Sequence, residues 1–291
     1  MNLKYCIQPN DNYFNIKELL KVKFQISDRL LIKLKKNKKI LLNGSPTFVD
    51  YNLKPFDTVE IIIDFEEESE NIVSLEMNLD IIYEDEYYLV INKPAGLAVH
   101  PSILHYNNSL SNGVKYYFEQ NDIKKKIRPI NRLDKDTSGI VIFAKNEYIQ
   151  EYLVREMKDN IFYKEYIAVC EGIFEENEGT ITFPIARKEN SIIERCVSLN
   201  GDIAITHYKV LKKVDNTSVV KCILETGRTH QIRVHLAHIG HPILGDTLYG
   251  NASKLINRQA LHAYKVKFVH PITGLNVDYV AEVPHDMINL M

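Results

Sequence analysis

The sequence predicts an α+β fold, in which a small N-terminal α/β module precedes a larger domain built on a largely antiparallel mixed sheet. Strand-like segments follow one another without a helix between them, as in residues 206–214 and 218–227. Neighbouring strands of this kind usually pair in antiparallel fashion. Neither GxGxxG after a strand nor GxxxxGKS/T occurs, so the doubly wound folds that bind nucleotides are not indicated. An acidic stretch at 64–70 separates the two parts.

The bulk composition is that of a soluble globular protein. The chain has 291 residues, of which 45% are hydrophobic and 25% charged, and its formal net charge is −2. No apolar run approaches the roughly 20 residues of a membrane span, and no signal sequence is evident. We therefore expect a cytoplasmic protein that is not bound to a membrane. No two of the four cysteines are spaced as a CxxC pair, so neither a zinc ribbon nor a redox dithiol is indicated.

Residues 1–65 form the predicted N-terminal module, and its lysines favour RNA binding. Residues 17–39 contain nine basic residues and two acidic ones. Apolar residues at helical spacing predict a helix that Ser27 or Asp28 caps, and strands are expected at 40–42 and 58–63. The alternative is a solvated lysine face that binds nothing. The candidate phosphate-binding residues are Lys33, Lys35, Lys36, Lys38 and Lys39.

Residues 66–74 are predicted to be an acidic linker, and residues 75–291 the larger domain. Charged and polar residues dominate the linker, so it lacks the side chains that form a core. The expected elements of the larger domain, in order, are strands at 81–93 and 140–143, a helix at 147–158, strands at 163–172, 206–214 and 218–227, and a helix at 229–240.

The stretch NRLDKDTSG places several charges directly before the apolar run 140–143. An Asp at the edge of a buried strand needs a partner or a function, because uncompensated burial of a carboxylate costs several kcal/mol. Asp134 is therefore a candidate catalytic residue. The alternative is a structural Asp that pairs with Arg132 or Lys135 or that caps a turn.

The stretch ETGRTHQIRVH, residues 225–235, marks the end of a strand and the start of a helix. Arg228 lies at this junction, where its guanidinium could pair with a carboxylate and keep it ionised. His230 and Arg233 are three positions apart and share a helix face. A positively charged helix start with a core-facing histidine is the alternative.

Two further patterns have a functional and a structural interpretation. His230, His235, His238 and His241 have helical spacings that suit metal binding, but no cysteine or carboxylate joins them, so no metal site is predicted. In strand 163–172, alternation places Tyr166 on one face with Lys164 and Ala168. Tyr166 could stack on a nucleobase or simply belong to the core.

Taken in order, these motifs resemble the RluA-type family of RNA pseudouridine synthases over nearly the whole chain. Residues 81–101 match the family's opening strand and loop, and NRLDKDTSG at 131–139 matches its catalytic motif, usually HRLDxxTSG. Residues 164–169 match its tyrosine-bearing strand, and 225–250 its final block. The N-terminal module resembles an S4 RNA-binding domain more loosely, since Pro55-Phe56-Asp57 stands where Gly-Asp is usual.

The resemblance implies roles for individual residues. Asp134 would be the catalytic carboxylate, and Arg132 would help the target base leave the RNA stack and hold the vacated space. Tyr166 would pack against the flipped uracil, and Arg228 would pair with Asp134. One departure lies in the catalytic motif, where Asn131 replaces the usual histidine.

The implied reaction is an isomerisation that needs no cofactor: uracil detaches at N1 from the ribose C1′, rotates and rejoins through C5. The expected partner is structured RNA, with large-subunit ribosomal RNA before transfer RNA, and the protein is expected to be a monomer. The run Lys124-Lys125-Lys126 could add phosphate contacts. A base-releasing glycosidase that uses Asp134 and Asp136, and a non-catalytic RNA-binding protein on an inactive synthase fold, are the alternatives.

Overall fold

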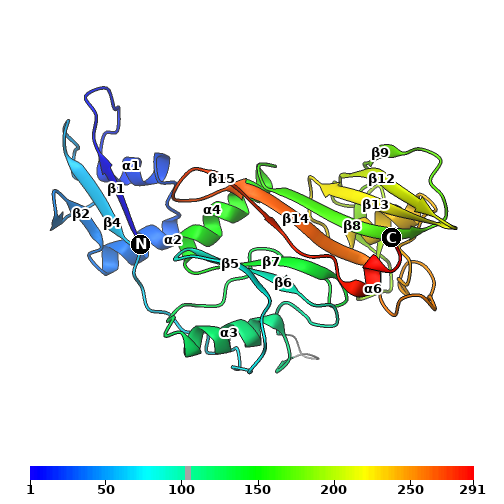
Figure 1. Ribbon diagram of the computed structural model, residues 1–291. Coiled ribbons are helices and arrows are strands. Elements are labelled where there is room, and N and C mark those ends of the chain that lie inside the picture. Colours follow the sequence, from blue (N-terminus) through cyan, green and yellow to red (C-terminus); the bar gives the residue numbers. More distant parts are fainter. Residues whose placement is uncertain (102–105) are drawn as a thin grey trace.

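The computed structural model describes residues 1–101 and 106–291. Within these residues the strands form a four-stranded N-terminal sheet, a nine-stranded central sheet and a two-stranded hairpin. The N-terminal module lies at one end of the molecule, and the long strands of the central sheet extend away from it (Figure 1). Of the helices in the described part of the chain, none has the length and apolar character needed to cross a membrane.

The N-terminal module combines an antiparallel sheet with two helices. Its elements are β1 (Asn2–Cys6), α1 (Ile16–Val22), α2 (Asp28–Lys36), β2 (Ile40–Leu42), β3 (Ser45–Pro46) and β4 (Thr58–Ile62), with strand order β1-β4-β2-β3. The predicted cap of α2 is Ser27, whose side chain accepts a hydrogen bond of 3.2 Å from the amide of Leu30. The predicted helix and both predicted strands are therefore confirmed, whereas the likeness to an S4 domain stays a prediction.

The central sheet is mixed and largely antiparallel, as predicted. Its order is β5-β6-β7-β14-β8-β13-β12-β9, with β15 beside β14. Among the described strands of this sheet, one pairing is parallel, and it joins β14 to β7 at His262 and Ala263. The elements from here to the end of the described chain are β5 (Ile81–Glu84), β6 (Tyr88–Lys93), α3 (Leu110–Gln120), β7 (Ser138–Ala144), α4 (Glu147–Lys158), β8 (Tyr163–Glu171), β9 (Glu178–Ile181), β10 (Ile185–Arg187), β11 (Arg195–Val197), β12 (Thr206–Val214), β13 (Thr217–Leu224), α5 (Gln231–His238), β14 (Leu261–Val269), β15 (Asn276–Val280) and α6 (His285–Ile288).

Strand β7 follows the charged motif and is buried along its whole length. Ile140 and Ile142 belong to the core cluster that includes residues of α4. Val141 and Phe143 belong to the cluster that includes residues of α3. Because successive side chains of a strand point to opposite faces, helices on both sides of the sheet explain the uninterrupted apolar run.

Gly139 allows β14 to approach β7 at their parallel junction. Its φ is +111°, a conformation that residues with a side chain rarely adopt. A Cβ atom at this position would lie 2.3 Å from the carbonyl oxygen of Ala263. The final glycine of the NRLDKDTSG motif is thus required by packing, three residues after Asp136.

The segment 81–93 forms two strands where the sequence predicts one. Asp85 interrupts it, because its Oδ1 accepts hydrogen bonds of 2.7 Å from the amide of Tyr87 and 2.8 Å from that of Tyr88. Asp side chains often bind the backbone in this way and favour a turn. By contrast, α4 spans 147–158 and β12 spans 206–214, as predicted.

Charged side chains connect the N-terminal module to the central domain. Lys33 of α2 lies 2.7 Å from a carboxylate oxygen of Glu67 and 3.0 Å from one of Glu147. Arg128 binds the other oxygen of Glu67 at 2.8 Å. Glu67, within the predicted linker, therefore contacts both parts, while the proposed boundaries of the linker stay a prediction.

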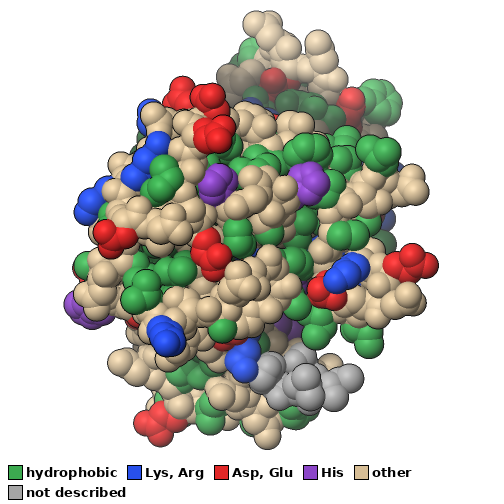
Figure 2. Space-filling view, turned by 90° about the vertical axis from the view of Figure 1, so that its right-hand side faces the viewer, with side chains coloured by type: hydrophobic (Ala, Val, Ile, Leu, Met, Phe, Trp, Pro, Cys, Tyr) green, Lys and Arg blue, Asp and Glu red, His purple; other side chains and the backbone are tan. Residues whose placement is uncertain are grey.

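The opposite end of the molecule carries β9, β12 and the C-terminus (Figure 1). Figure 2 shows that face, on which hydrophobic, acidic, basic and histidine side chains are interspersed. Charged side chains of either sign are scattered over the face that this view shows and form no single patch on it.

Candidate functional site

The backbone around Asp134 forms a tight turn just before β7, an interior strand of the central sheet. The amide of Thr137 donates to the carbonyl of Asp134 at 3.1 Å. Arg258 donates to the carbonyl of Asp136 at 3.2 Å. Just before the turn, the side chain of Asn131 donates to Ile140 O at 2.8 Å and accepts from Ile142 N at 2.9 Å. Asn131, which stands where histidine is usual, thus ties the loop to β7.

Lys93 supports the same turn from beneath. Its ammonium donates to the carbonyls of Pro94, Leu97 and Lys135 at 2.9, 2.8 and 2.9 Å, and its side chain is fully buried. Burial lowers the pKa of Lys93 to about 7. Lysine is almost never fully buried without partners for its charge, so the three carbonyls account for the buried position of Lys93, a role that was not predicted from the sequence.

Arg233, from the first turns of α5, is the partner of Asp134. Its Nη1 donates to Oδ2 of Asp134 at 2.9 Å. Its Nε and Nη2 donate to the two oxygens of the fully buried Asp246, at 2.7 and 2.8 Å. One guanidinium therefore joins the loop after Arg132 to the loop after α5, in the bidentate geometry that favours specific pairing.

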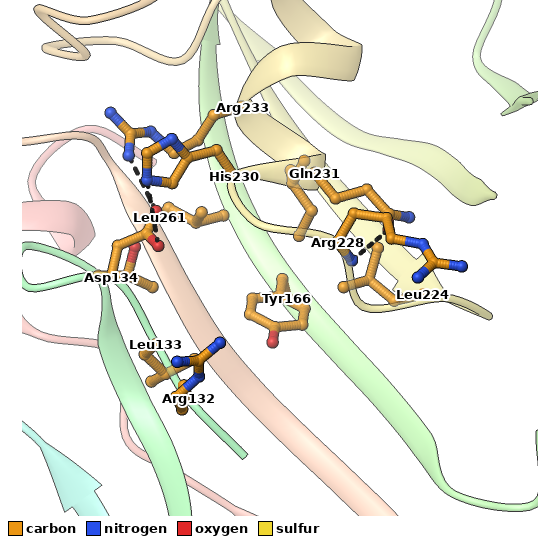
Figure 3. Close-up of a pocket in the computed structure, with 12 residues that line it drawn as sticks. Arg132, Leu133, Asp134, Tyr166, Leu224, Arg228, His230, Gln231, Arg233 and Leu261 are labelled. Atoms are coloured by element: carbon orange, nitrogen blue, oxygen red, sulfur yellow. Dashed lines mark hydrogen bonds and ion pairs between the residues drawn. The ribbon is translucent and has the colours of Figure 1, made fainter. Parts of the chain in front are cut away.

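The prediction that Arg228 pairs with Asp134 is wrong. Arg228 donates from Nε to the carbonyl of Ile203 at 2.9 Å and lies 3.6 Å from Asp202. Figure 3 shows its guanidinium directed away from Asp134, whereas Arg233 and His230 point toward it. The physical reason is the position of the helix start: Arg228 precedes α5 in the junction after β13, and Arg233 lies on the face of α5 that meets the loop.

Buried polar contacts position the start of α5. The side chain of Gln231 accepts from the amide of Arg228 at 2.9 Å and donates to the carbonyl of Ile205 at 2.9 Å. Thr226 donates to the same Gln231 oxygen at 2.8 Å. These bonds tie the strand-to-helix junction to the segment just before β12, so that the following residues project toward Asp134.

The side chains around Asp134 line a narrow pocket of about 70 Å³. The pocket overlaps a groove of about 620 Å³ that continues past Lys164 and Arg195. Arg132, Asp134, Tyr166 and Arg228 all line both spaces, so the structure brings the predicted site residues together (Figure 3). The residues that line the pocket are Arg132, Leu133, Asp134, Thr137, Tyr166, Leu224, Arg228, His230, Gln231, Ile232, Arg233 and Leu261.

The electrostatics of the pocket combine one carboxylate with several cations. Burial disfavours the charged form of Arg233, but hydrogen bonds and the charges of Asp246 and Asp134 outweigh this effect and raise its pKa. Burial, and then the charge of Asp134, raises the pKa of Tyr166. At neutral pH the pocket therefore holds a charged guanidinium and a protonated phenol.

The other histidines of the 230–241 run serve structural contacts. His235 is buried and lies 2.9 Å from the hydroxyl of Thr206 and 2.8 Å from the carbonyl of Phe183. His241 stacks on Phe174 with ring centroids 3.9 Å apart. In residues 1–101 and 106–291, no group of three or more His, Cys, Asp or Glu side chains is placed to hold a metal ion.

The five candidate phosphate-binding lysines of the N-terminal module fall into two groups. Lys35, Lys36 and Lys38 are exposed. Lys33 contacts Glu67 and Glu147, as described above, and Lys39 lies 2.9 Å from Asp64. Of these five lysines, only Lys35, Lys36 and Lys38 are exposed and have no ion-pair partner among the described residues.

The chain is similar to known RNA pseudouridine synthases. The RNA pseudouridylate synthase family matches residues 87–238, which include Asp134, Tyr166 and Arg233. An uncharacterized RNA pseudouridine synthase of Bacillus subtilis, YjbO, is 40% identical over 267 residues, which cover 91% of this chain and 94% of that protein.

A relative with a named substrate is the ribosomal large subunit pseudouridine synthase D of Zymomonas mobilis. It is 39% identical over 224 residues, which cover 72% of this chain and 70% of that protein. Among solved structures, human RNA pseudouridylate synthase domain containing 1 superposes with a TM-score of 0.59 and 28% identity. That match covers 70% of this chain and 83% of the human chain.

Proposed function

This chain belongs to the RNA pseudouridylate synthase family, and on that basis we propose that it isomerises specific uridines of large-subunit ribosomal RNA, with Asp134 as the single catalytic carboxylate. The observation that carries the proposal is the contact of Asp134 with Arg233 inside a pocket that also contains Tyr166 and Arg132. Among the described residues that line this pocket, Asp134 is the one carboxylate.

Asp134 acts through its carboxylate, which a charge-assisted hydrogen bond from the guanidinium of Arg233 holds in position. Attack on the ribose, addition to the uracil ring and elimination through a glycal are all compatible with one carboxylate. The buried strand β7 and the carbonyl contacts of Lys93 hold the loop in place. Such rigidity matters, because a displacement of about 1 Å at a reacting group can reduce the rate 100-fold.

The neighbouring residues handle the extruded nucleoside. The target uridine must leave the RNA stack, which costs a few kcal/mol. Arg132, exposed at the mouth of the pocket, assists this step and occupies the vacated space. Tyr166 packs against the flipped uracil. Arg228 binds the substrate from the side of the groove and leaves Asp134 to Arg233.

The groove supports contacts with the RNA backbone. Its lining contains Arg132, Lys164, Arg195 and Arg228. Beyond Arg228, a further cavity of about 420 Å³ adds Arg187. Guanidinium and ammonium groups in this arrangement bind phosphates and orient the RNA without reading its sequence.

The N-terminal module supplies a second contact with RNA in this proposal. Lys35, Lys36 and Lys38 present their charges to solvent, and they are the phosphate-binding residues that we favour. Lys33 contributes indirectly, because its ion pairs with Glu67 and Glu147 orient the module on the central domain.

Large-subunit ribosomal RNA is the favoured substrate because several relatives carry that substrate in their names. Transfer RNA is the alternative. With either substrate we expect the protein to act in the cytoplasm as a monomer.

Mapping of pseudouridines across total RNA tests the proposal. Cells that lack the protein should lose one or a few pseudouridines in large-subunit ribosomal RNA, and the wild-type gene should restore them, whereas a gene for Asp134→Asn should not. Losses confined to transfer RNA would correct the substrate. Release of free uracil from RNA by the purified protein would instead indicate a glycosidase, and an unchanged map would refute the proposal.

A further inference from the structure

His230 faces the second oxygen of the carboxylate that Arg233 binds. Its Nε2 lies 3.7 Å from Oδ1 of Asp134, and its side chain is only 11% exposed. The imidazole also lines both the pocket and the adjoining groove. Figure 3 shows His230 and Arg233 side by side above Asp134, with Tyr166 on the far side of the opening.

The backbone of His230 is held in an unfavourable conformation that points its side chain into the pocket. Its φ and ψ are 58° and 19°, in the left-handed region, directly before the first residue of α5. A residue with a side chain rarely adopts this conformation, because its Cβ comes too close to the following carbonyl oxygen. Such strain persists where the surrounding structure enforces it, and it concentrates at functional sites.

Tyr249 fixes the orientation of the imidazole ring. Its hydroxyl lies 2.8 Å from Nδ1 of His230 and accepts a hydrogen bond of 2.8 Å from the amide of Arg195. With Nδ1 engaged by Tyr249, Nε2 is the ring nitrogen that faces Asp134 and the pocket. A histidine that is ordered in this way resembles a general base whose position is set by a third group.

The isomerisation needs a base near Asp134. When C5 of uracil bonds to C1′, the same carbon still carries its hydrogen, which must leave as a proton. The electron pair of the C5–H bond then restores the C5=C6 double bond, and N1 takes up a proton from water. The reacting C1′ lies where Asp134 acts, so the group that accepts the C5 proton must lie within a few ångströms of that carboxylate.

Resting on the proposed function, we infer that His230 is the general base that removes the proton from C5. In the neutral imidazole Nδ1 carries the hydrogen and donates it to the hydroxyl oxygen of Tyr249, so the Nε2 lone pair accepts the C5 proton, and the imidazolium later releases that proton to water. One proton leaves C5 and one joins N1, so the reaction remains an isomerisation with no redox partner. This step follows formation of the C5–C1′ bond and is the same for each route by which Asp134 could act.

The other groups in the pocket are poorer bases. Arg132, Arg228 and Arg233 carry guanidinium groups, which have no lone pair to offer. The raised pKa of Tyr166 keeps its phenol protonated. Burial, assisted by the charges of Arg233 and Arg195, lowers the pKa of His230, although Asp134 and Asp246 act in the opposite direction. His230 is therefore neutral near pH 7 and can accept a proton.

Two substitutions test this role without opposing the backbone conformation. Both glycine and asparagine adopt the left-handed region readily, so His230→Gly and His230→Asn should fold, which circular dichroism and urea unfolding can verify. The substrate is a large-subunit ribosomal RNA transcript made with uridine that carries deuterium at C5. We expect His230→Asn to lose roughly 100- to 10,000-fold in rate and to show a larger deuterium isotope effect than the wild type.

Rescue by imidazole separates a chemical role from a structural one. Added imidazole should restore turnover to His230→Gly, which leaves space for it, but not to His230→Asn. A wild-type isotope effect in His230→Asn, or no rescue of His230→Gly, would overturn the inference while leaving the proposed function intact. If the wild-type protein itself forms no pseudouridine on any RNA, the proposed function and this inference are both wrong.

Discussion

The Nη1 of Arg233 donates a hydrogen bond of 2.9 Å to Oδ2 of Asp134, a residue 99 positions earlier in the chain. The same guanidinium binds Asp246, so Arg233 lies between one fully buried carboxylate and one that faces a pocket. Asp246 thereby holds Arg233 in the orientation that Asp134 needs. The candidate site is thus a connected set of charges, and each member can be tested separately.

Asp134→Asn should abolish pseudouridine formation while preserving the fold. The amide cannot act as a nucleophile or a base, so we expect activity below about one-thousandth of the wild type. The measurement is pseudouridine in ribosomal RNA after incubation with the purified variant. Asp136→Asn is the matched control and should keep most of its activity, since Asp136 does not line the pocket. Substantial turnover by Asp134→Asn would contradict the assignment.

Asp246→Asn should lower both stability and rate. The change leaves Arg233 buried with a weakened partner, and breaking a buried pair typically costs about 3–5 kcal/mol of the free energy of unfolding. Urea unfolding measures this loss, and single-turnover kinetics measure the effect on the rate. Asp286→Asn serves as the control: the carboxylate of Asp286, which pairs with Arg258, is half-exposed, so the change should cost about 1 kcal/mol or less. Equal losses in both variants would argue against a special role for Asp246.

Gly139→Ala should destabilise the protein strongly. Its Cβ would lie 2.3 Å from the carbonyl oxygen of Ala263, at a φ of +111°, so β14 must move away from β7. We expect a loss of roughly 3 kcal/mol or more in the free energy of unfolding. Gly44→Ala has positive φ but nothing within 4 Å, and it should cost about 1–2 kcal/mol. Similar values for the two variants would mean that the sheet accommodates the methyl group.

The exposed lysines of α2 should account for part of the salt dependence of RNA binding. Lys36→Ala removes an exposed charge, and each lost phosphate contact should reduce the slope of log affinity against log salt by about 0.7–0.9. Lys39→Ala, whose charge is paired with Asp64, should leave the slope nearly unchanged. Filter binding at several salt concentrations makes the comparison. Identical slopes for wild type and Lys36→Ala would show that this face does not bind phosphate.

The contact of Glu67 with the module should weaken in acid. Burial opposes ionisation of Glu67, but hydrogen bonds and charges from Lys33 and Arg128 prevail and lower its pKa below 4.5. A carboxyl group with a lowered pKa stabilises the folded state above its ordinary pKa and loses this effect as pH falls through the lowered value. Urea unfolding should therefore show Glu67→Gln to be less stable than wild type at pH 7, with a gap that closes below 4.5. A gap of constant size would refute this linkage.

Local sequence patterns predicted the elements well where one physical rule dominates. Helix α4 has its predicted bounds because one apolar period runs through it, and strand β12 has its predicted bounds although a register shift interrupts it between Val210 and Lys212. The prediction of one strand at 81–93 was wrong, because the side chain of Asp85 binds the backbone and divides this segment into two strands. Periodicity does not reveal a side chain that competes with the sheet for backbone hydrogen bonds.

Motifs and periods are local properties of the chain, so the amino-acid sequence was enough to predict the α+β class, the family and the group of residues around Asp134. The three-dimensional fold was needed to show that Arg233, and not Arg228, pairs with Asp134. It also revealed Asp246 behind that arginine and Lys93 beneath the loop. Arg228 and Arg233 lie in one short motif and carry the same charge. Which of them reaches the carboxylate of Asp134 depends on how α5 is oriented against the sheet, and contacts between residues distant in sequence set that orientation.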